Sequence, residues 1–122
     1  MANRFSVIMP VLNEAALIDE AIDRLEALER CDECECIVVD GDPEGSTIRA
    51  AAHRRVRGLH SPPGRAVQMN AGAAAATGEI LIFLHADTRL PRAALSLIDR
   101  AMADQTLAGG AFDLRIDSER PA

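Results

Sequence analysis

A short apolar run at residues 80–84 ends abruptly in the polar tripeptide His85-Ala86-Asp87. An apolar run of this length, without helical periodicity and bounded by turn signals, is typical of a strand buried on both faces of a parallel sheet. In open α/β sheets the carboxyl ends of such strands face the ligand crevice. Asp87 therefore either belongs to a metal or phosphate site at that edge, or only caps a turn before Pro91.

Strand-like and helix-like segments alternate along the whole chain. This alternation predicts an α/β fold with a mostly parallel sheet and right-handed crossovers. The predicted strands cover residues 5–9, 36–39, 56–60, 79–84 and 109–116, and the predicted helices cover 13–29, 46–55, 65–77 and a segment that begins at Pro91.

Turn-forming residues mark the ends of the predicted helices. Asn13 is a plausible N-cap for the first helix, and Ser46 or Thr47 can cap the second. Gly78 stands where a C′ glycine is expected after the third helix. These signals support the helix boundaries that the apolar periodicity gives.

Composition limits the class of protein. The chain of 122 residues is long enough for one domain only. Hydrophobic residues make up 48% of it and aromatic residues 2%, so we expect an aliphatic core. A formal net charge of −6 argues against a nucleic-acid-binding surface, which usually carries a basic excess.

Localisation signals point to the cytoplasm. No segment reaches the roughly 18–20 apolar residues that cross a bilayer, and the first residues lead into a strand without a signal peptide.

The cysteines Cys31, Cys34 and Cys36 are close together in the sequence, but a structural zinc site needs four ligands, usually as two separated pairs. We expect reduced thiols with a structural or incidental role.

Polar turns follow three of the predicted strands, at residues 10–14, 40–46 and 85–87. Because the carboxyl ends of parallel strands meet at one edge of a sheet, these turns would line a crevice with carboxylates. Carboxylates repel phosphates, so a phosphate-bearing ligand there would need a divalent cation such as Mg²⁺ or Mn²⁺, or a cation from the protein. Arg65, at the start of a helix, is either a second positive group for phosphate or a solvated helix-terminal arginine.

Three common site classes have no motif in the chain. The first strand is followed by Pro-Val-Leu-Asn-Glu, not by the G-x-G-x-x-G turn that holds a dinucleotide. The P-loop pattern G-x-x-x-x-G-K-[ST] and the nucleophile elbow G-x-S-x-G are also absent. The crevice is therefore of a different kind from these phosphate-binding and hydrolase sites.

Several segments resemble motifs of the family-2 glycosyltransferases, the large GT-A group that uses nucleotide-sugar donors. Residues 6–14, SVIMPVLNE, resemble the opening motif, and residues 38–47, VVDGDPEGST, resemble the second motif. Residues 64–79 resemble the stretch that leads to the metal-binding strand, and residues 83–88, FLHADT, lie where the family has Asp-x-Asp. The combined pattern is most similar to a bacterial subgroup of arsenosugar-biosynthesis-type glycosyltransferases.

The resemblance implies a GT-A fold, a Rossmann-like three-layer sandwich that is incomplete at the C-terminal end. Residues 1–122 would form a single nucleotide-sugar-binding domain. Asp40 would hydrogen-bond the base, and Asp87 would hold the divalent metal, Mn²⁺ or Mg²⁺, that bridges the two phosphates. The residues implied for nucleotide binding are Pro10, Val11, Glu14, Asp40, Asp42 and Arg65.

The chain departs from the family pattern in two places. His85 stands where the leading aspartate of the metal motif is expected; an imidazole can ligate Mn²⁺ but brings no negative charge, so His85 either ligates weakly or points into the sheet. Asp42-Pro43-Glu44 replaces a Gly-Ser-rich turn, and the proline stiffens the loop and removes an N–H donor. We expect base or ribose recognition to differ accordingly.

The family's inverting transfer needs a general base, which lies well after the Asp-x-Asp region. Asp113, Asp117 and Glu119 are available carboxylates, but no motif assigns the base to any of them. We therefore expect the donor-binding part of a longer transferase, able to bind a donor but with little or no transfer to its unknown acceptor. An incomplete sheet would also leave an open edge at its last strand, which favours homo-oligomers.

Two other classes remain open. A nucleotidyltransferase-like domain would also use a metal and carboxylates, but it should carry a Gly-rich phosphate loop that residues 10–15 lack. A non-catalytic binding or assembly module would keep the fold without the metal. Loss of Mn²⁺-dependent nucleotide binding in an Asp87→Ala variant would separate the transferase from this module.

Overall fold

The computed structural model describes residues 3–103, and within them four parallel strands form one sheet. The strand order is β3-β2-β1-β4. The strand predicted at 109–116 lies outside the described residues. The strands are β1 (Phe5–Val11), β2 (Cys34–Asp40), β3 (Arg57–His60) and β4 (Ile80–Phe83).

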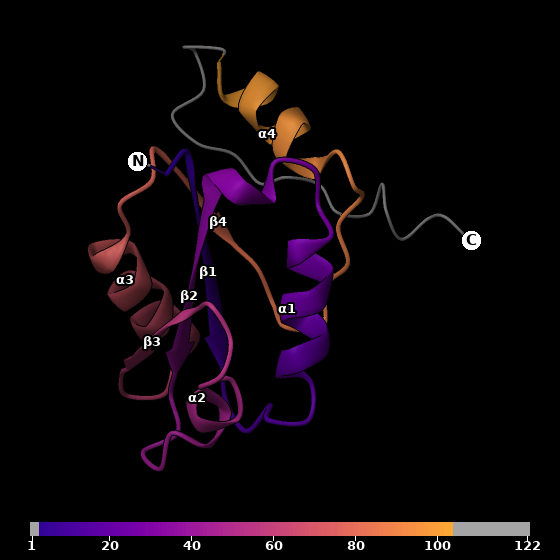
Figure 1. Cartoon of the computed structure of the whole chain (residues 1–122). Helices are drawn as coiled ribbons and strands as arrows, with labels where there is room; N and C mark the ends of the chain where they lie inside the picture. The colour runs from indigo at the N-terminus through magenta and orange to yellow at the C-terminus, as the bar shows by residue number, and fades with distance from the viewer. Residues whose placement is uncertain (1–2, 104–122) are drawn as a thin grey trace, which may run out of the picture.

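Helices cover both faces of the sheet, with α1 on one side and α3 on the other (Figure 1). This arrangement confirms the parallel α/β architecture predicted from the alternation of segments. The helices are α1 (Ile18–Glu26), η1 (Cys31–Glu33, a 3₁₀ turn), α2 (Ser46–Ala50), α3 (Arg65–Ala75) and α4 (Ala94–Met102).

The core lies mainly between the sheet and α1, where alternate residues of β1 point. Phe5, Val7 and Met9 are fully buried on this side and pack with apolar residues of α1 and α4. The opposite face holds a smaller cluster around Ile8 and Val39, covered by the Ala-rich helix α3. The core of the described residues is almost wholly aliphatic, as the composition predicts.

Glycines allow α3 and its following loop to approach β1 closely. A Cβ added to Gly72 would lie 2.4 Å from Cγ2 of Ile8, so only a glycine fits there. Gly78 is not the predicted C′ residue, because α3 already ends at Ala75. Its N–H donates to Oγ of Ser6 at 2.8 Å, and a Cβ on Gly78 would lie 2.6 Å from that oxygen.

The first helix begins later than the sequence predicts. Asn13 has a φ of 55°, in the left-handed region, so it forms a turn and is not an N-cap. The carboxylate of Glu14 accepts from the N–H of Leu12 at 3.1 Å, and its carbonyl accepts from Leu17 and Ile18 at 2.9 and 3.1 Å. These bonds close a turn, and α1 starts only at Ile18.

Helices α2 and α4 are also shorter than predicted. Helix α2 ends at Ala50, and a turn at residues 51–53 followed by a bend at 54–55 replaces its predicted last part. Helix α4 starts at Ala94, because residues 91–93 form a turn in which the N–H of Ala94 donates to the carbonyl of Pro91 at 2.9 Å.

Strand β4 pairs with β1 and carries two exposed apolar side chains, Leu81 and Phe83, at 40% and 46% exposure. Both alternate with the buried Ile80 and Ile82, so they face the α3 side of the sheet. Among residues 3–103, no helix has the length and apolar character that crossing a membrane requires.

Candidate functional site

The predicted site residues come from segments that end at the carboxyl edge of the sheet. Val11 is the register partner of Asp40, and the N–H of Gly41 donates to the carbonyl of Val11 at 3.0 Å. The N–H of Leu84 donates to the carbonyl of Ile8 at 3.0 Å, so the chain leaves β4 at the same edge. The structure therefore gathers at one edge the three polar turns that the sequence predicts.

Asp40 is fully buried and holds the loop that follows β2. Its Oδ1 accepts from the N–H of Asp42 at 2.9 Å, and its Oδ2 accepts from the N–H groups of Thr47 and Ile48, both at 3.1 Å. A carboxylate has about four acceptor positions, so three are already used by the main chain. Asp40 thus fixes the start of α2.

Asp42 caps the same helix from the outside. Its Oδ2 accepts from Oγ of Ser46 at 2.6 Å and from the N–H of Ser46 at 3.2 Å, and its Oδ1 accepts from the N–H of Glu44 at 3.0 Å. The Ser46 hydroxyl and then the Glu44 N–H hold the pKa of this carboxyl below its usual range. Two aspartates, rather than the predicted Ser46 or Thr47 side chains, therefore satisfy the first N–H groups of α2.

Glu14 connects the loop after β1 to α2. Its N–H donates to Oγ1 of Thr47 at 2.9 Å, and its half-buried carboxylate turns back to the N–H of Leu12. The nearby Pro10 is half-buried and Val11 is buried at the end of β1. Pro10, Val11 and Glu14 thus lie together at the carboxyl edge, at the end of β1 and in the loop that follows it.

Gln68 also lies at this edge, and it is not among the site residues that the sequence predicts. Its side chain is only 4% exposed, and its Nε2 donates to the carbonyls of Val11 and Val39, both at 2.9 Å. Its Oε1 accepts from the N–H of Gly64 at 3.1 Å. One amide therefore ties β1, β2 and the turn before Arg65 together. The available sequence signal was an uncharged polar side chain within an Ala-rich helix, which Asn70 shares.

Arg65 is exposed and is the first residue of α3. Gly64 before it has a φ of 139°, which a side chain rarely adopts. The first N–H groups of a helix have no partner within the helix and favour anions. Arg65 and the helix start thus put positive charge beside the ends of β1 and β2.

The loop after β4 carries the predicted metal residues. Asp87 is exposed, His85 is half-buried, and Ala86 between them is buried. The loop turns through a bond from the N–H of Thr88 to the carbonyl of His85 at 3.1 Å. Arg24 of α1 donates from Nη2 to the carbonyl of Ala86 at 2.7 Å.

Asp87 and His85 fit a divalent cation whose other ligands come from a bound phosphate and water. Within residues 3–103, no group of three or more His, Cys, Asp or Glu side chains is placed to hold a metal alone. Asp87, with or without His85, can supply one or two ligands. Mg²⁺ and Mn²⁺ commonly bind through one or two carboxylates, with substrate phosphates and water supplying the remaining oxygens. The donor set suits a cation that arrives with a phosphate ligand.

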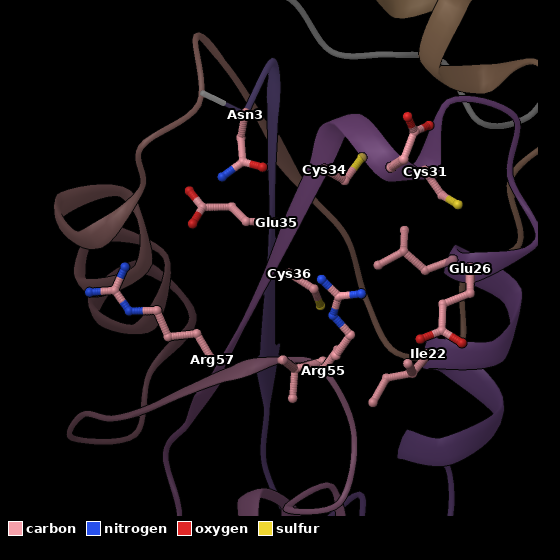
Figure 2. Close-up of a pocket in the computed structure, with 12 residues that line it drawn as sticks. Asn3, Ile22, Glu26, Cys31, Cys34, Glu35, Cys36, Arg55 and Arg57 are labelled. Carbon is pink, nitrogen blue, oxygen red and sulfur yellow. The ribbon is translucent and has the colours of Figure 1, made fainter. Parts of the chain in front are cut away.

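A separate hollow of about 540 Å³ lies at the opposite, amino edge of the sheet (Figure 2). The three cysteines line it, with acidic Glu26 and Glu35 on its walls. Burial raises the pKa of the Cys34 and Cys36 thiols to about 12, so both are protonated near neutral pH. None of the predicted nucleotide or metal residues lines this hollow.

Comparison with known proteins gives consistent matches. The model of the glycosyl transferase family 2 matches residues 6–121. PGL/p-HBAD biosynthesis glycosyltransferases of Mycobacterium tuberculosis and Mycobacterium bovis are 33% identical over 96 residues, which is 73% of this chain and 37% of each relative.

Solved structures show the same fold. A mannosyltransferase from Pyrobaculum calidifontis, in complex with GDP-Man and Mn²⁺, superposes with a TM-score of 0.70 at 30% identity over 88% of this chain. Glucosyl-3-phosphoglycerate synthase from Mycobacterium tuberculosis, in complex with Mn²⁺, UDP and phosphoglyceric acid, superposes with a TM-score of 0.57 at 27% identity over 88% of the chain. The chain spans 34% and 40% of those two proteins.

Proposed function

Because this chain belongs to the glycosyl transferase family 2, we propose that its carboxyl sheet edge binds a nucleoside-diphosphate sugar together with a divalent cation. The observation that carries this proposal is the convergence at one edge of the turns after β1, β2 and β4, joined to the start of α3 by Gln68. The presence of GDP-Man or UDP with Mn²⁺ in the two related structures supports it.

We assign the nucleoside to the wall formed by the turns after β1 and β2. Pro10, Val11 and Glu14 supply one side, with Asp40 and Asp42 on the other. Asp40 holds the loop through three main-chain bonds and retains about one acceptor position for a base N–H. A direct bond from the base to Asp40 remains a prediction.

We assign the diphosphate to the space between the start of α3 and the loop after β4. Arg65 would donate to phosphate oxygens in the geometry that a guanidinium favours. Asp87, with His85 as a further ligand, would hold Mn²⁺ or Mg²⁺. A bound cation there would neutralise the charge that develops on the departing nucleoside diphosphate.

We further propose that transfer to an acceptor hydroxyl is inverting and requires chain beyond the described residues. The predicted carboxylates Asp113, Asp117 and Glu119 lie outside those residues. The chain spans between 34% and 40% of its relatives, so donor binding is the part of the reaction that this domain is expected to perform. Similarity to the arsenosugar-biosynthesis subgroup stays a prediction.

Calorimetric titration with UDP, GDP and TDP sugars, with and without Mn²⁺, tests the proposal. We expect one donor class to bind only with Mn²⁺, and Asp87→Ala to lose that dependence. Asp32→Ala is the matched control, because Asp32 is an exposed aspartate at the amino edge of the sheet. An Asp87→Ala titration identical to that of the wild type would reject the metal site.

A further inference from the structure

Arg24 connects α1 to the loop that carries the candidate metal residues. Its Nη2 donates to the carbonyl of Ala86 at 2.7 Å, although the two residues are 62 positions apart. The Arg24 side chain is 23% exposed, and its Nη1 lies 3.7 Å from Oε1 of Glu20. Ala86 is buried between His85 and Asp87.

This contact places a charged group in a largely buried position. A guanidinium loses hydration when it is buried and therefore needs partners there. Nε of Arg24 is buried and has no acceptor within residues 3–103. The bond to Ala86 is therefore the main polar contact that compensates the burial of this side chain.

The hydrogen bond from Arg24 to Ala86 also constrains the orientation of Asp87, because Ala86 and Asp87 share a peptide unit. The carbonyl of Ala86 and the N–H of Asp87 belong to one planar peptide unit. A donor that fixes the direction of that carbonyl also fixes the plane from which the Asp87 side chain departs. His85 precedes the same short turn, which the bond from Thr88 to the His85 carbonyl closes.

We propose that Arg24 is a positioning residue for the metal ligand Asp87, an inference that rests on the proposed function. Arg24 makes no direct contact with the donor in this scheme; it orients the peptide that presents Asp87. Groups that orient a metal ligand in this way typically change metal affinity by about 10- to 100-fold when they are removed.

The test compares Arg24→Met, Arg24→Lys and Arg54→Met. Methionine keeps an aliphatic stem but cannot donate to Ala86, whereas lysine can donate again. Arg54 is the matched control. Its side chain is 15% exposed, its Nη2 donates to Oδ1 of Asp23 in α1 at 2.8 Å, and none of its hydrogen bonds is to the loop at 85–87.

Two readouts are measured: Mn²⁺ affinity in the presence of the donor, by paramagnetic resonance titration, and amide hydrogen exchange at residues 85–88 in the metal-free protein. We expect Arg24→Met to weaken Mn²⁺ binding about 10-fold and to speed exchange at 85–88, with Arg24→Lys partly restoring both. Arg54→Met should change neither.

Three outcomes would overturn the inference. Unchanged Mn²⁺ affinity in a folded Arg24→Met protein means that Asp87 needs no support from Arg24. An equal loss of Mn²⁺ affinity in Arg54→Met means that general destabilisation of the protein, and not the contact with Ala86, causes the loss. A wild-type protein that binds no Mn²⁺ with any donor removes the proposed function itself, and this outcome is recognised before any variant is made.

Discussion

Nε2 of Gln68 lies 2.9 Å from the carbonyl oxygen of Val11, and this bond fastens α3 to the end of β1 at the candidate donor site. The same nitrogen reaches the carbonyl of Val39, and Oε1 of the amide accepts from Gly64. The Gln68 side chain thus adds a hydrogen bond to each of three main-chain groups at the carboxyl edge, from β1, from β2 and from the turn before α3.

Replacing Gln68 with leucine should destabilise the protein by on the order of 3 kcal/mol, because three hydrogen bonds at a buried position are lost. Urea unfolding at pH 7 measures the change. Asn70→Leu on the exposed side of the same helix should change the free energy of unfolding by less than about 0.5 kcal/mol. Equal effects of the two substitutions would show that the buried amide has no special role.

Gly72→Ala should destabilise the protein by about 1–3 kcal/mol, although alanine is the better helix former. The new Cβ would lie 2.4 Å from Cγ2 of Ile8 and 3.1 Å from Cγ2 of Val39, so α3 must move away from the sheet. Thermal unfolding measures the change. A stabilised Gly72→Ala protein would contradict the close packing of α3, and the exposed Ala74→Gly gives the helix-propensity effect alone.

The sequence predicted the order and type of the elements well, because long apolar runs and helical periodicity report burial directly. It failed at helix ends that depend on partners distant in the chain. The late start of α1 depends on Glu14 and its bond to Thr47, and the start of α2 depends on the buried Asp40. The contacts of Gln68 join residues up to 57 positions apart, and no local pattern reports them.

The open sheet edge predicted at residues 109–116 lies outside the described residues, but β4 is an edge strand of the described sheet, so self-association through it can be tested there. Leu81 and Phe83 are exposed apolar side chains on this strand, which pairs only with β1 among the described strands. Lysine on an edge strand disfavours pairing with a second chain. We expect Leu81→Lys with Phe83→Lys to shift sedimentation toward the monomer. A wild-type protein that is monomeric at high concentration would contradict the prediction.

Asp99 should make the stability of the protein depend on acid pH. Hydrogen bonds from Arg4 and then Arg30 hold the pKa of its carboxyl below the usual range. The folded pKa is lower than the unfolded value of about 3.9, so the stabilisation is present above that value and is lost as the pH falls through the folded pKa.

We therefore expect Asp99→Asn to be less stable than the wild type at pH 7, by up to about 1 kcal/mol, and the difference to shrink as the pH falls through the folded pKa of Asp99. Urea unfolding across this range measures the difference. Glu29→Gln serves as the control, because Glu29 is an exposed carboxylate in the turn that follows α1. If the free energy of unfolding of Asp99→Asn is lower than that of the wild type by the same amount at all pH values, the ion pairs of Asp99 do not cause the difference.

Cys34 and Cys36 at the amino edge should resist alkylation in the folded protein. Burial raises the pKa of Cys34 and Cys36 to about 12, against about 8.5 for a free thiol, so the thiolate fraction near pH 8 falls roughly a thousand-fold. The same shift means that stability falls as the pH rises above about 8.5, because only the unfolded thiols then ionise. Iodoacetamide labelling followed by peptide mass spectrometry should show slow modification of both residues at pH 8 and fast modification in urea. Fast labelling of Cys36 without denaturant would contradict its burial between the sheet and α1.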